Sequence, residues 1–362
     1  MHYIMKNKTT KRLFMIFGCF LAVILILLLI REITTVRIGS AEELIAFSEQ
    51  VNSGKTYFGR KIILTDDIPF DKSVERNFTP IASSVKEDQL HDNVFSGTFD
   101  GKGHIISGVN IQNGSITSYS IGIFGRISKF GTVKNLGVED SIILGNDAVG
   151  AIASSNKGTI KNCYNTGQVG IYKNISIGSV GGLVGENYGR IYNCYNAGEV
   201  ATVYDNFGQT GGIAGVNAGK IENCYNRGNV SNISNKTEYT DWNRMGYVGG
   251  ISGSNARKIK NCYNVGLISG NSLVGGISGG NRTSHVNRLT ADSFPKINNS
   301  FYLNSTAPTG IGFDETGNAE VNSREESEMK KKSFAHQLDI GNFLNQWKQN
   351  DNLNDGYPHL HI

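Results

Sequence analysis

The sequence predicts an all-β fold, a right-handed parallel β-helix. A phrase of Gly, Asn and aliphatic residues recurs between Val149 and Gly280, and each copy holds three short apolar clusters bounded by Gly or Asn. These clusters are too short for helices, and no 3.6-residue period runs through the copies. One copy cannot bury its own apolar side, so copies must stack at the ~4.8 Å spacing of neighbouring strands. Parallel crossovers are almost always right-handed, which sets the expected hand.

Successive copies begin at Val149, Val180, Thr210, Val248 and Val274, with spacings of 31, 30, 38 and 26 residues. A worn copy from Ile121 and a fading one that ends near Leu303 place the repeat region at residues 121–303. Worn end copies are typical of solenoids. Residues that recur in every copy are interpreted as structural; in the clearest copy they are Gly181, Gly182, Gly185, Asn187, Gly189, Ile191, Asn193, Cys194 and Tyr195.

Asparagine recurs at two positions of the repeat. Stacked amides can hydrogen-bond along a column, and Asn tolerates the left-handed backbone that corners require. We therefore expect two Asn columns, with a polar binding stripe as the alternative reading. The first column comprises Asn156, Asn187, Asn217, Asn255 and Asn281, and the second Asn162, Asn193, Asn223 and Asn261.

Four cysteines, Cys163, Cys194, Cys224 and Cys262, share one repeat position. Side chains in register point in parallel and keep their Cβ atoms too far apart for an ideal disulfide, so we expect buried free thiols, with disulfides as the alternative. No C-x-x-C pair and no nearby histidine supports zinc, and neither a metal nor a cofactor is expected. Cys19 lies in an apolar segment, where lipidation is a weaker alternative.

The N-terminal segment resembles a membrane anchor. Residues 1–12 are basic and are expected in the cytoplasm, and residues 13–30 form an uncharged apolar run. A run of this length is at the short end for a spanning helix, and the basic flank places the following chain outside. No small-x-small cleavage site follows, so an uncleaved signal anchor is preferred over a secreted protein with a cleaved signal peptide.

Helical caps are expected at both ends of the stack. In residues 39–120, Ser40 and Glu43 predict a capping box for a helix whose apolar face holds Leu44, Ile45 and Phe47, ahead of a first strand at residues 62–64. Residues 325–362 are predicted to form the second cap. This cap contains an amphipathic helix over residues 325–344, with Phe334, Leu338 and Phe343 on its apolar face.

The stretch from Gly181 to Tyr195 closely resembles the GLUG repeat of bacterial surface proteins. The segment from Phe95 to Ile106 looks like the one that precedes such repeats, and Trp347 with residues 355–358 looks like their C-terminal ending. The resemblance covers about Gly39 to Leu360. It implies a β-helical rod on a cell surface, as in adhesin-like proteins and the non-catalytic region of immunoglobulin A proteases, and it carries over no catalytic residue.

Catalysis is not expected. The His-Glu-x-x-His motif of the zinc protease domain is absent, and acidic residues in the repeats are sparse. Only Asp205 and Asp241 hold comparable loop positions, whereas a polysaccharide lyase or hydrolase, the enzymatic alternative, needs several carboxylates on adjacent coils. Arg190, Lys220 and Lys258 form a partial cationic column, either solvated charge or a stripe for an anionic glycan. The net charge of +4 is too small to indicate a nucleic-acid partner, and the expected export argues against one.

The best candidate for binding is the loop that joins the third strand of one coil to the next coil. This loop varies in length and carries aromatic residues, and variable loops on a rigid scaffold are where binding sites concentrate. We expect a non-catalytic binding or adhesion module whose partner is a surface glycan or a host or matrix protein. A purely structural surface element is the remaining alternative. The candidate ligand-binding residues are Tyr204, Phe207, Tyr239, Trp242 and Tyr247.

Overall fold

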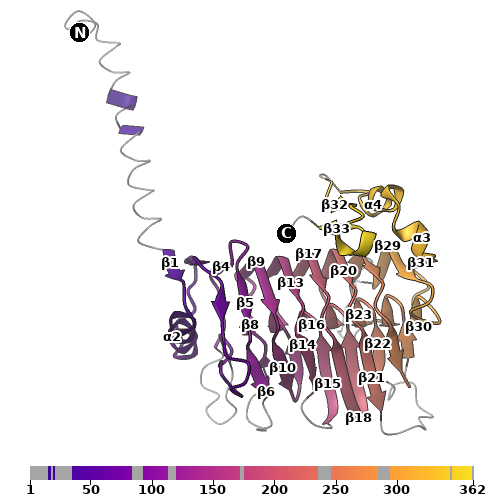
Figure 1. Ribbon diagram of the computed structural model, residues 1–362, viewed down its shortest axis with the longest axis horizontal. Coiled ribbons are helices and arrows are strands. Elements are labelled where there is room, and N and C mark those ends of the chain that lie inside the picture. The colour runs from indigo at the N-terminus through magenta and orange to yellow at the C-terminus, as the bar shows by residue number, and fades with distance from the viewer. Residues whose placement is uncertain are drawn as a thin grey trace, which may run out of the picture.

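A computed structural model describes residues 15–17, 19–20, 35–83, 93–112, 120–171, 175–234, 246–271, 273–283, 294–342 and 345–360. The chain forms a parallel β-helix, as predicted, in which each coil contributes a strand to each of three parallel sheets (Figure 1). The handedness stays a prediction. Among the described residues, no helix is both long and apolar enough to span a membrane. Most of the predicted anchor at residues 13–30 lies outside these residues, so it also stays a prediction.

Sheet I runs the length of the rod. Its strands are β1 (Thr35–Ile38), β2 (Lys61–Leu64), β3 (Ile68–Pro69), β4 (Thr98–Asp100), β5 (Ile105–Ser107), β9 (Thr132–Glu139), β13 (Thr159–Asn165), β17 (Arg190–Asn196), β20 (Lys220–Asn226), β24 (Lys258–Lys260), β25 (Tyr263–Asn264), β29 (Lys296–Leu303) and β31 (Ala319–Arg324). The expected first strand at residues 62–64 is in fact the second, because β1 precedes the helix and pairs with β2.

Sheets II and III complete each coil. Sheet II comprises β6 (Asn110–Gln112), β7 (Ser120–Ile121), β10 (Ile142–Gly145), β11 (Ala148–Gly150), β14 (Gln168–Ile171), β15 (Ile175–Gly181), β18 (Val200–Gly211), β21 (Val230–Ser234), β22 (Tyr247–Gly249), β26 (Ile268–Gly270) and β27 (Leu273–Gly275). Sheet III comprises β8 (Phe124–Ile127), β12 (Ala153–Asn156), β16 (Val184–Asn187), β19 (Ala214–Asn217), β23 (Ser252–Asn255), β28 (Ser278–Asn281) and β30 (Ile311–Asp314).

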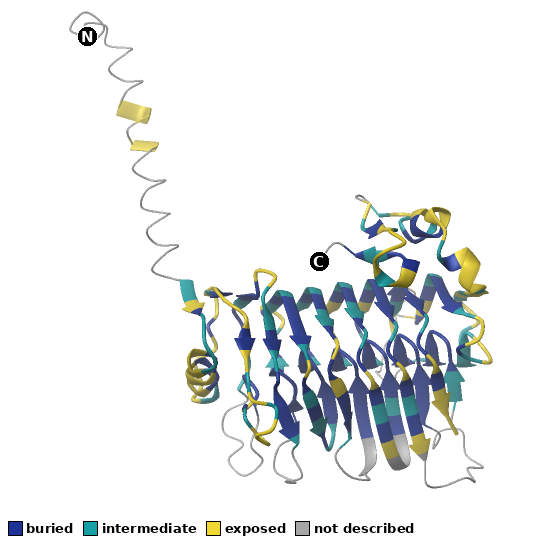
Figure 2. Ribbon diagram, in the orientation of Figure 1, coloured by how far each residue is buried: buried dark blue, intermediate teal, exposed yellow. Residues whose placement is uncertain are grey.

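The interior of the rod is one continuous apolar core with side chains from all three sheets. Figure 2 shows that most residues in the strands of the stack are buried or intermediate. Glycines of the repeat lie where coils touch. A Cβ on Gly189 would stand 2.1 Å from the carbonyl oxygen of Gly158, and one on Gly182 would stand 2.3 Å from that of Gly212. Any larger residue would therefore push adjacent coils apart, which explains why these positions recur as Gly.

Both predicted asparagine columns are present. In the first, the Asn156 amide donates to Asn187 and the Asn187 amide donates to Asn217, each at 2.8 Å, and the side chains are buried. In the second, Asn162, Asn193, Asn223 and Asn261 have φ between 51° and 54° and turn the strand of sheet I through a left-handed corner.

A third column went unrecognised, although its residue closes every Asn-Cys-Tyr-Asn element. The Asn165 amide donates to Asn196 and the Asn196 amide donates to Asn226, both at 2.9 Å, and Asn226 donates to Asn264 at 2.8 Å. Each amide also donates to the carbonyl two residues ahead, as from Asn196 to Gly198. The recurrence of this Asn is visible in the sequence, but the residue was interpreted only as the end of the Asn-Cys-Tyr-Asn motif.

The cysteine column consists of free, buried thiols, as expected. The Cys194 thiol donates to the carbonyl of Tyr192, two residues earlier, at 3.2 Å, and Cys163 and Cys262 repeat this geometry. Burial raises the pKa of the Cys163 and Cys224 thiols. The column therefore behaves as packed apolar volume.

The N-terminal helix α2 (Ala41–Asn52) closes one end of the stack (Figure 1). Leu44, Phe47 and Val51 join the main core, whereas Ile45 is 36% exposed and was wrongly assigned to the buried face. The Ser40 hydroxyl accepts from the Glu43 N–H, as predicted. The Glu43 carboxylate accepts from the N–H of Gly39, one residue before the expected partner.

The third column can be tested with Asn196→Ala. The substitution leaves the amides of its neighbours without buried partners, at a cost of roughly 1–3 kcal/mol for each unsatisfied group. We expect a loss of about 3 kcal/mol in the free energy of unfolding, measured by urea denaturation followed by circular dichroism. The exposed Asn352→Ala serves as the control. Equal stability of the two variants would contradict a stabilising role for the column.

Thiol titration tests the cysteine column. At pH 8 the native full-length chain is expected to react with a thiol reagent only at the exposed Cys19, because the other four cysteines are buried and closed to the reagent. In denaturant all five should react. Rapid reaction of more than one thiol in the native chain would show that the column is open to solvent.

Candidate functional site

Three of the five predicted binding residues lie in strands of sheet II. Tyr204 and Phe207 lie in β18, but their side chains are outside the described part of the structure, as are Tyr239 and Trp242 altogether. Tyr247, at the start of β22, is 3% exposed and its hydroxyl accepts a hydrogen bond from Arg282 at 2.8 Å. Its ring is packed within the rod and does not face a ligand, so Tyr247 is left out of the binding proposal below.

Successive coils reach this edge in register. Leu144 at the end of β10 pairs with Gln112, and Gly145 pairs with Ile171 at the end of β14. Farther along the rod, Tyr204 of β18 pairs with Ser234, the last residue of β21. These residues lie on one line along the rod, which we call the loop edge. The expected loop at Tyr204 and Phe207 was wrong, because β18 runs through both residues to Gly211 without a break.

Two exposed apolar residues at the loop edge were not predicted from the sequence. Val203 in β18 and Ile233 in β21 are direct register partners, 36% and 56% exposed. They follow the apolar positions of the repeat by only a few residues, and nothing in the local pattern separates them from core residues. Together they add an apolar surface beside the predicted aromatic loops.

The tyrosines of the repeat form a second feature on the outside of sheet I. The rings of Tyr164, Tyr195, Tyr225 and Tyr263 stack with centroids 4.8–5.0 Å apart and planes within 7° of parallel. Tyr225 and Tyr263 are 3% and 0% exposed, whereas Tyr164 and Tyr195 are half-buried. Burial is the main reason that the pKa of Tyr195 is raised to about 12.

The C-terminal residues cover the buried half of this stack and do not close the end of the rod. Helix α3 (Glu326–Met329), helix α4 (Lys332–Leu338), the short helix η4 (Asn354–Gly356) and the antiparallel pair β32 (Trp347–Lys348) and β33 (His359–Leu360) form a small module beside sheet I (Figure 1). Trp347 lies 5.4 Å from the Tyr263 ring, and Phe334 lies 5.9 Å from it, between ring centroids. The predicted second cap is thus a lateral clasp.

The predicted single helix of residues 325–344 was also wrong. It is interrupted after Met329, where Lys331 adopts an extended backbone and begins α4. Phe334 and Leu338 are buried as expected, and Phe343 lies outside the described residues. The break lets both helices present apolar side chains to the flat tyrosine stack.

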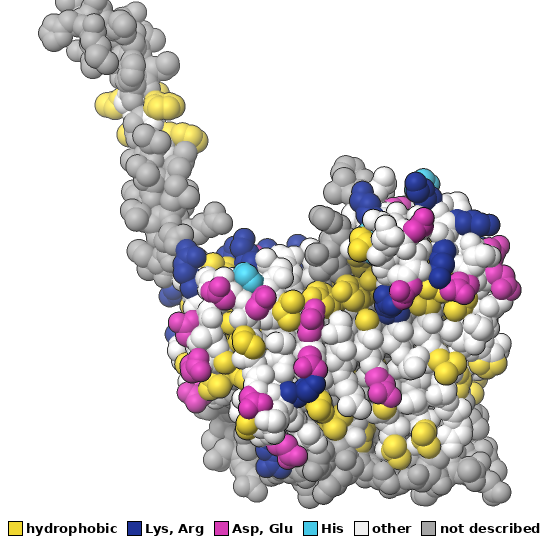
Figure 3. Space-filling view, in the orientation of Figure 1, with side chains coloured by type: hydrophobic (Ala, Val, Ile, Leu, Met, Phe, Trp, Pro, Cys, Tyr) yellow, Lys and Arg dark blue, Asp and Glu magenta, His cyan; other side chains and the backbone are white. Residues whose placement is uncertain are grey.

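Polar contacts join the clasp to the second asparagine column. The Asn342 amide donates to Asn223 at 3.1 Å, the Asn193 amide donates to Gln346 at 2.7 Å, and the Asn299 amide donates to the carbonyl of Gln337. In Figure 3, hydrophobic side chains form a band along the upper part of the rod that leads to the clasp. The clasp is therefore held by side chains that recur in the repeat, namely the tyrosine stack and the second asparagine column.

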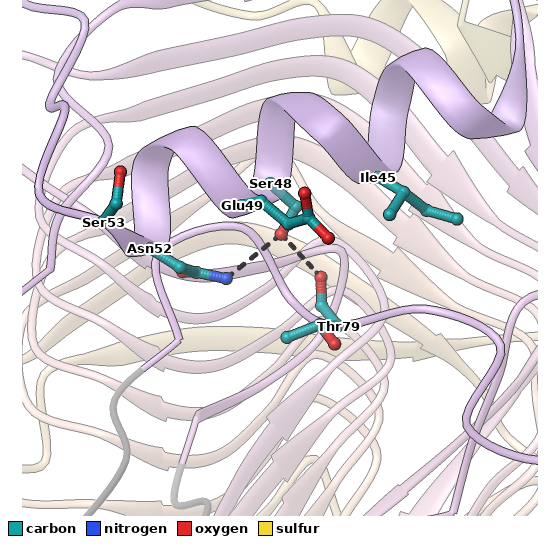
Figure 4. A pocket seen from close by; sticks show the side chains of 6 residues that line it. All are labelled: Ile45, Ser48, Glu49, Asn52, Ser53 and Thr79. Atoms are coloured by element: carbon teal, nitrogen blue, oxygen red, sulfur yellow. Dashed lines mark hydrogen bonds between the residues drawn. The ribbon is translucent and has the colours of Figure 1, made fainter.

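A shallow groove of about 410 Å³ lies between α2 and the segment around Thr79 (Figure 4). The Ser48 hydroxyl donates to the Thr79 carbonyl at 2.8 Å, and the Asn52 amide donates to Ser48 and to the Pro80 carbonyl. These polar groups serve to hold the helix against the first coils. The groove is consequently a seam of the fold and offers little chemistry to a ligand.

Two carboxyl groups on adjacent coils interact electrostatically. Burial raises the pKa of Asp147 and of Glu186, and the charge of Asp147 raises that of Glu186 further. The Tyr188 hydroxyl donates to Glu186 at 3.1 Å. The expected pair of Asp205 and Asp241 cannot be placed, because neither side chain lies within the described residues. Within the described ranges, no three His, Cys, Asp or Glu side chains converge as a metal site would require.

Comparison with known proteins supports the resemblance drawn from the sequence. The model of the GLUG motif matches residues 176–203. A crystal structure from Bacteroides ovatus, of a protein provisionally named an immunoglobulin A1 protease, superposes with a TM-score of 0.61 and covers 90% of this chain and 91% of its own, at 21% identity. At that identity the likeness concerns the fold alone.

A curated relative matches one third of this chain and is a far larger protein. Halomucin from Haloquadratum walsbyi is 28% identical over 127 residues, which are 33% of this chain and 1% of halomucin. The predicted class is therefore confirmed: the chain is a GLUG-motif repeat protein of the β-helix type. The motif defines the repeat and names no ligand.

The clasp makes a testable prediction. Trp347→Ala removes a 3% exposed ring from the tyrosine stack, and losing a buried aromatic side chain costs about 3–5 kcal/mol. We expect faster amide hydrogen exchange throughout residues 326–338 and 347–360, with sheets II and III unchanged. Leu353→Ala, 50% exposed in the same module, is the matched control. Unchanged exchange in the clasp would mean that other contacts hold it.

Proposed function

We propose that this chain is a non-catalytic binding or adhesion module that acts outside the cell and is anchored through residues 13–30. The observation that carries the proposal is the loop edge, where non-repeated segments start in register from a rigid rod. A rigid scaffold lowers the entropy lost when several loops engage one partner. Val203 and Ile233 supply apolar surface. The sequence adds the aromatic residues Tyr204 and Phe207 in β18, and Tyr239 and Trp242 in the segment after β21.

The names of similar proteins are compatible with this role but do not define it. Peptidase activity, which the name of the Bacteroides ovatus protein suggests for that protein, is not proposed here because the sequence has no His-Glu-x-x-His motif. A surface glycan or a host or matrix protein is the proposed partner, since aromatic rings suit both. No nucleic acid and no cofactor is proposed.

A polysaccharide-active enzyme is the second candidate, favoured by Asp147 and Glu186. Paired carboxyl groups with raised pKa values can supply a general acid and base. Glu186 pairs with Ser155 and Val216 in the neighbouring coils, so the fold does not require an acid at this position. The binding role is preferred, because the described residues bring together a single interacting pair, whereas such an enzyme needs several carboxylates on adjacent coils.

A binding screen tests the proposal. The full-length chain in detergent is applied to arrays of cell-wall glycans, host glycans and matrix proteins, beside Ile233→Asp and Trp242→Ala. Each substitution is expected to weaken binding at least tenfold, about 1.4 kcal/mol. The control is Leu267→Asp, because Leu267 is 52% exposed and precedes β26, at the opposite end of the strand from the loop edge.

Two results would contradict the proposal. Equal loss of binding in Leu267→Asp and Ile233→Asp would remove the loop edge as the site, and no binding to any target would favour the structural role. Products with new reducing ends or unsaturated sugars, abolished by Glu186→Gln, would establish the enzyme instead.

A further inference from the structure

One outward column of sheet I changes character along the rod. In the early coils it holds Thr35 and Lys61, and then Thr98, Thr132 and Thr159 in three consecutive coils. In the next four coils the same position holds only cations: Arg190, Lys220, Lys258 and Lys296. At one strand spacing per coil, this cation column is about 14 Å long. Because threonine fills the position in three coils, the fold does not require a charge there.

Repulsion between the stacked cations lowers the stability of sheet I. Like charges directly opposite one another in neighbouring strands are destabilising. Glu222 offsets part of this repulsion, at 2.7 Å from Lys258 and 3.8 Å from Arg190. Burial opposes ionisation of Glu222, but these cations hold its pKa below the usual value. Among the ion pairs of the described residues, none includes Lys220 or Lys296.

The neighbouring column adds cations and an aromatic ring. Lys161, Tyr192, Glu222 and Lys260 are register partners in successive coils. The guanidinium of Arg190 lies 5.3 Å from the centre of the Tyr192 ring, and the ammonium of Lys161 lies 5.8 Å from it. The ring thus holds two cations at the start of the cation column and remains half-buried itself.

The cation column ends in a groove of about 590 Å³. Phe294, 41% exposed, lines the groove with Lys296, Asn298 and Glu320. An exposed ring, an amide, an ammonium and a carboxylate can together meet the apolar face, the hydroxyls and the carboxylate of an acidic sugar. The groove gives a linear ligand a terminal subsite.

We propose that the cation column and its terminal groove bind a linear acidic polysaccharide, with one sugar carboxylate facing each of several coils. A single file of cations fits a single-chain polymer that carries regularly spaced charges. Glu222 and Glu320 within the surface can accept hydrogen bonds from sugar hydroxyls, which the backbone of single-stranded DNA does not offer. This surface is on sheet I and is independent of the loop edge on sheet II.

The test uses polygalacturonate as the probe and its fully methyl-esterified form as the neutral comparison. The full-length chain in detergent is titrated with each polymer by isothermal calorimetry. Tight binding of polygalacturonate that weakens with rising salt, and at least tenfold weaker binding of the ester, is expected. The triple variant Lys220→Thr, Lys258→Thr, Lys296→Thr restores the threonine of the early coils, and it is expected to fold normally and to lose at least tenfold in affinity.

A matched triple variant removes the same charge elsewhere: Lys129→Thr, Lys332→Thr and Lys348→Thr, three exposed positions away from the cation column. It should bind like the unmodified chain. Equal loss in both triple variants, equal binding of the methyl ester, or tighter binding of single-stranded DNA of equal charge would each overturn the proposal. Trp242→Ala is expected to leave this binding unchanged, which separates its outcome from that of the loop edge.

Discussion

The repeat coils of this protein are held in register by amide ladders. An apolar side chain tolerates small shifts, but a buried amide loses its hydrogen bond if its partner moves by one residue. The first column keeps its 2.8 Å contact whether the two asparagines are 26, 30, 31 or 38 residues apart. The ladders therefore uncouple the length of the intervening chain from the stacking of the coils. Insertions can accumulate at the loop edge without any change to the core.

The same register makes the outside of the rod a set of straight columns. A tyrosine at one repeat position becomes a stack of parallel rings, and a lysine becomes a row of charges. Each column can serve a different purpose because its members do not contact the core. The clasp packs its apolar side chains against the tyrosine stack. Its residues Asn342 and Gln346 form hydrogen bonds with left-handed asparagines of the second column. Uniform columns also explain why the rod has no single deep cleft among its described surfaces.

The sequence predicted most contacts between equivalent residues, although it missed the third asparagine column. The stacked Asn187 and Asn217, the free cysteines and the three strands per coil all follow from the repeat period. Contacts between unlike segments of the chain were not predicted. Asn342 donates a hydrogen bond to Asn223, 119 residues earlier, and no sequence period indicates that pair. Tyr247 failed for a similar reason, since its place in a variable loop suggested exposure while Arg282 binds its hydroxyl. The predicted residues Tyr239 and Trp242 lie outside the described structure and stay predictions.

Among the columns of stacked side chains, the charged column is the one whose members repel one another. Stacked aromatic rings and amides attract their neighbours in the next coil, so their columns stabilise the rod. Stacked ammonium groups repel, yet four consecutive coils keep them where three earlier coils have threonine. A ligand that places its own charges at the coil spacing removes this repulsion as it binds, and each further coil adds to the effective affinity. A row of cations at the coil spacing therefore suits a linear polymer of like spacing. The outward column that stabilises the rod least is also the one that best indicates the kind of ligand.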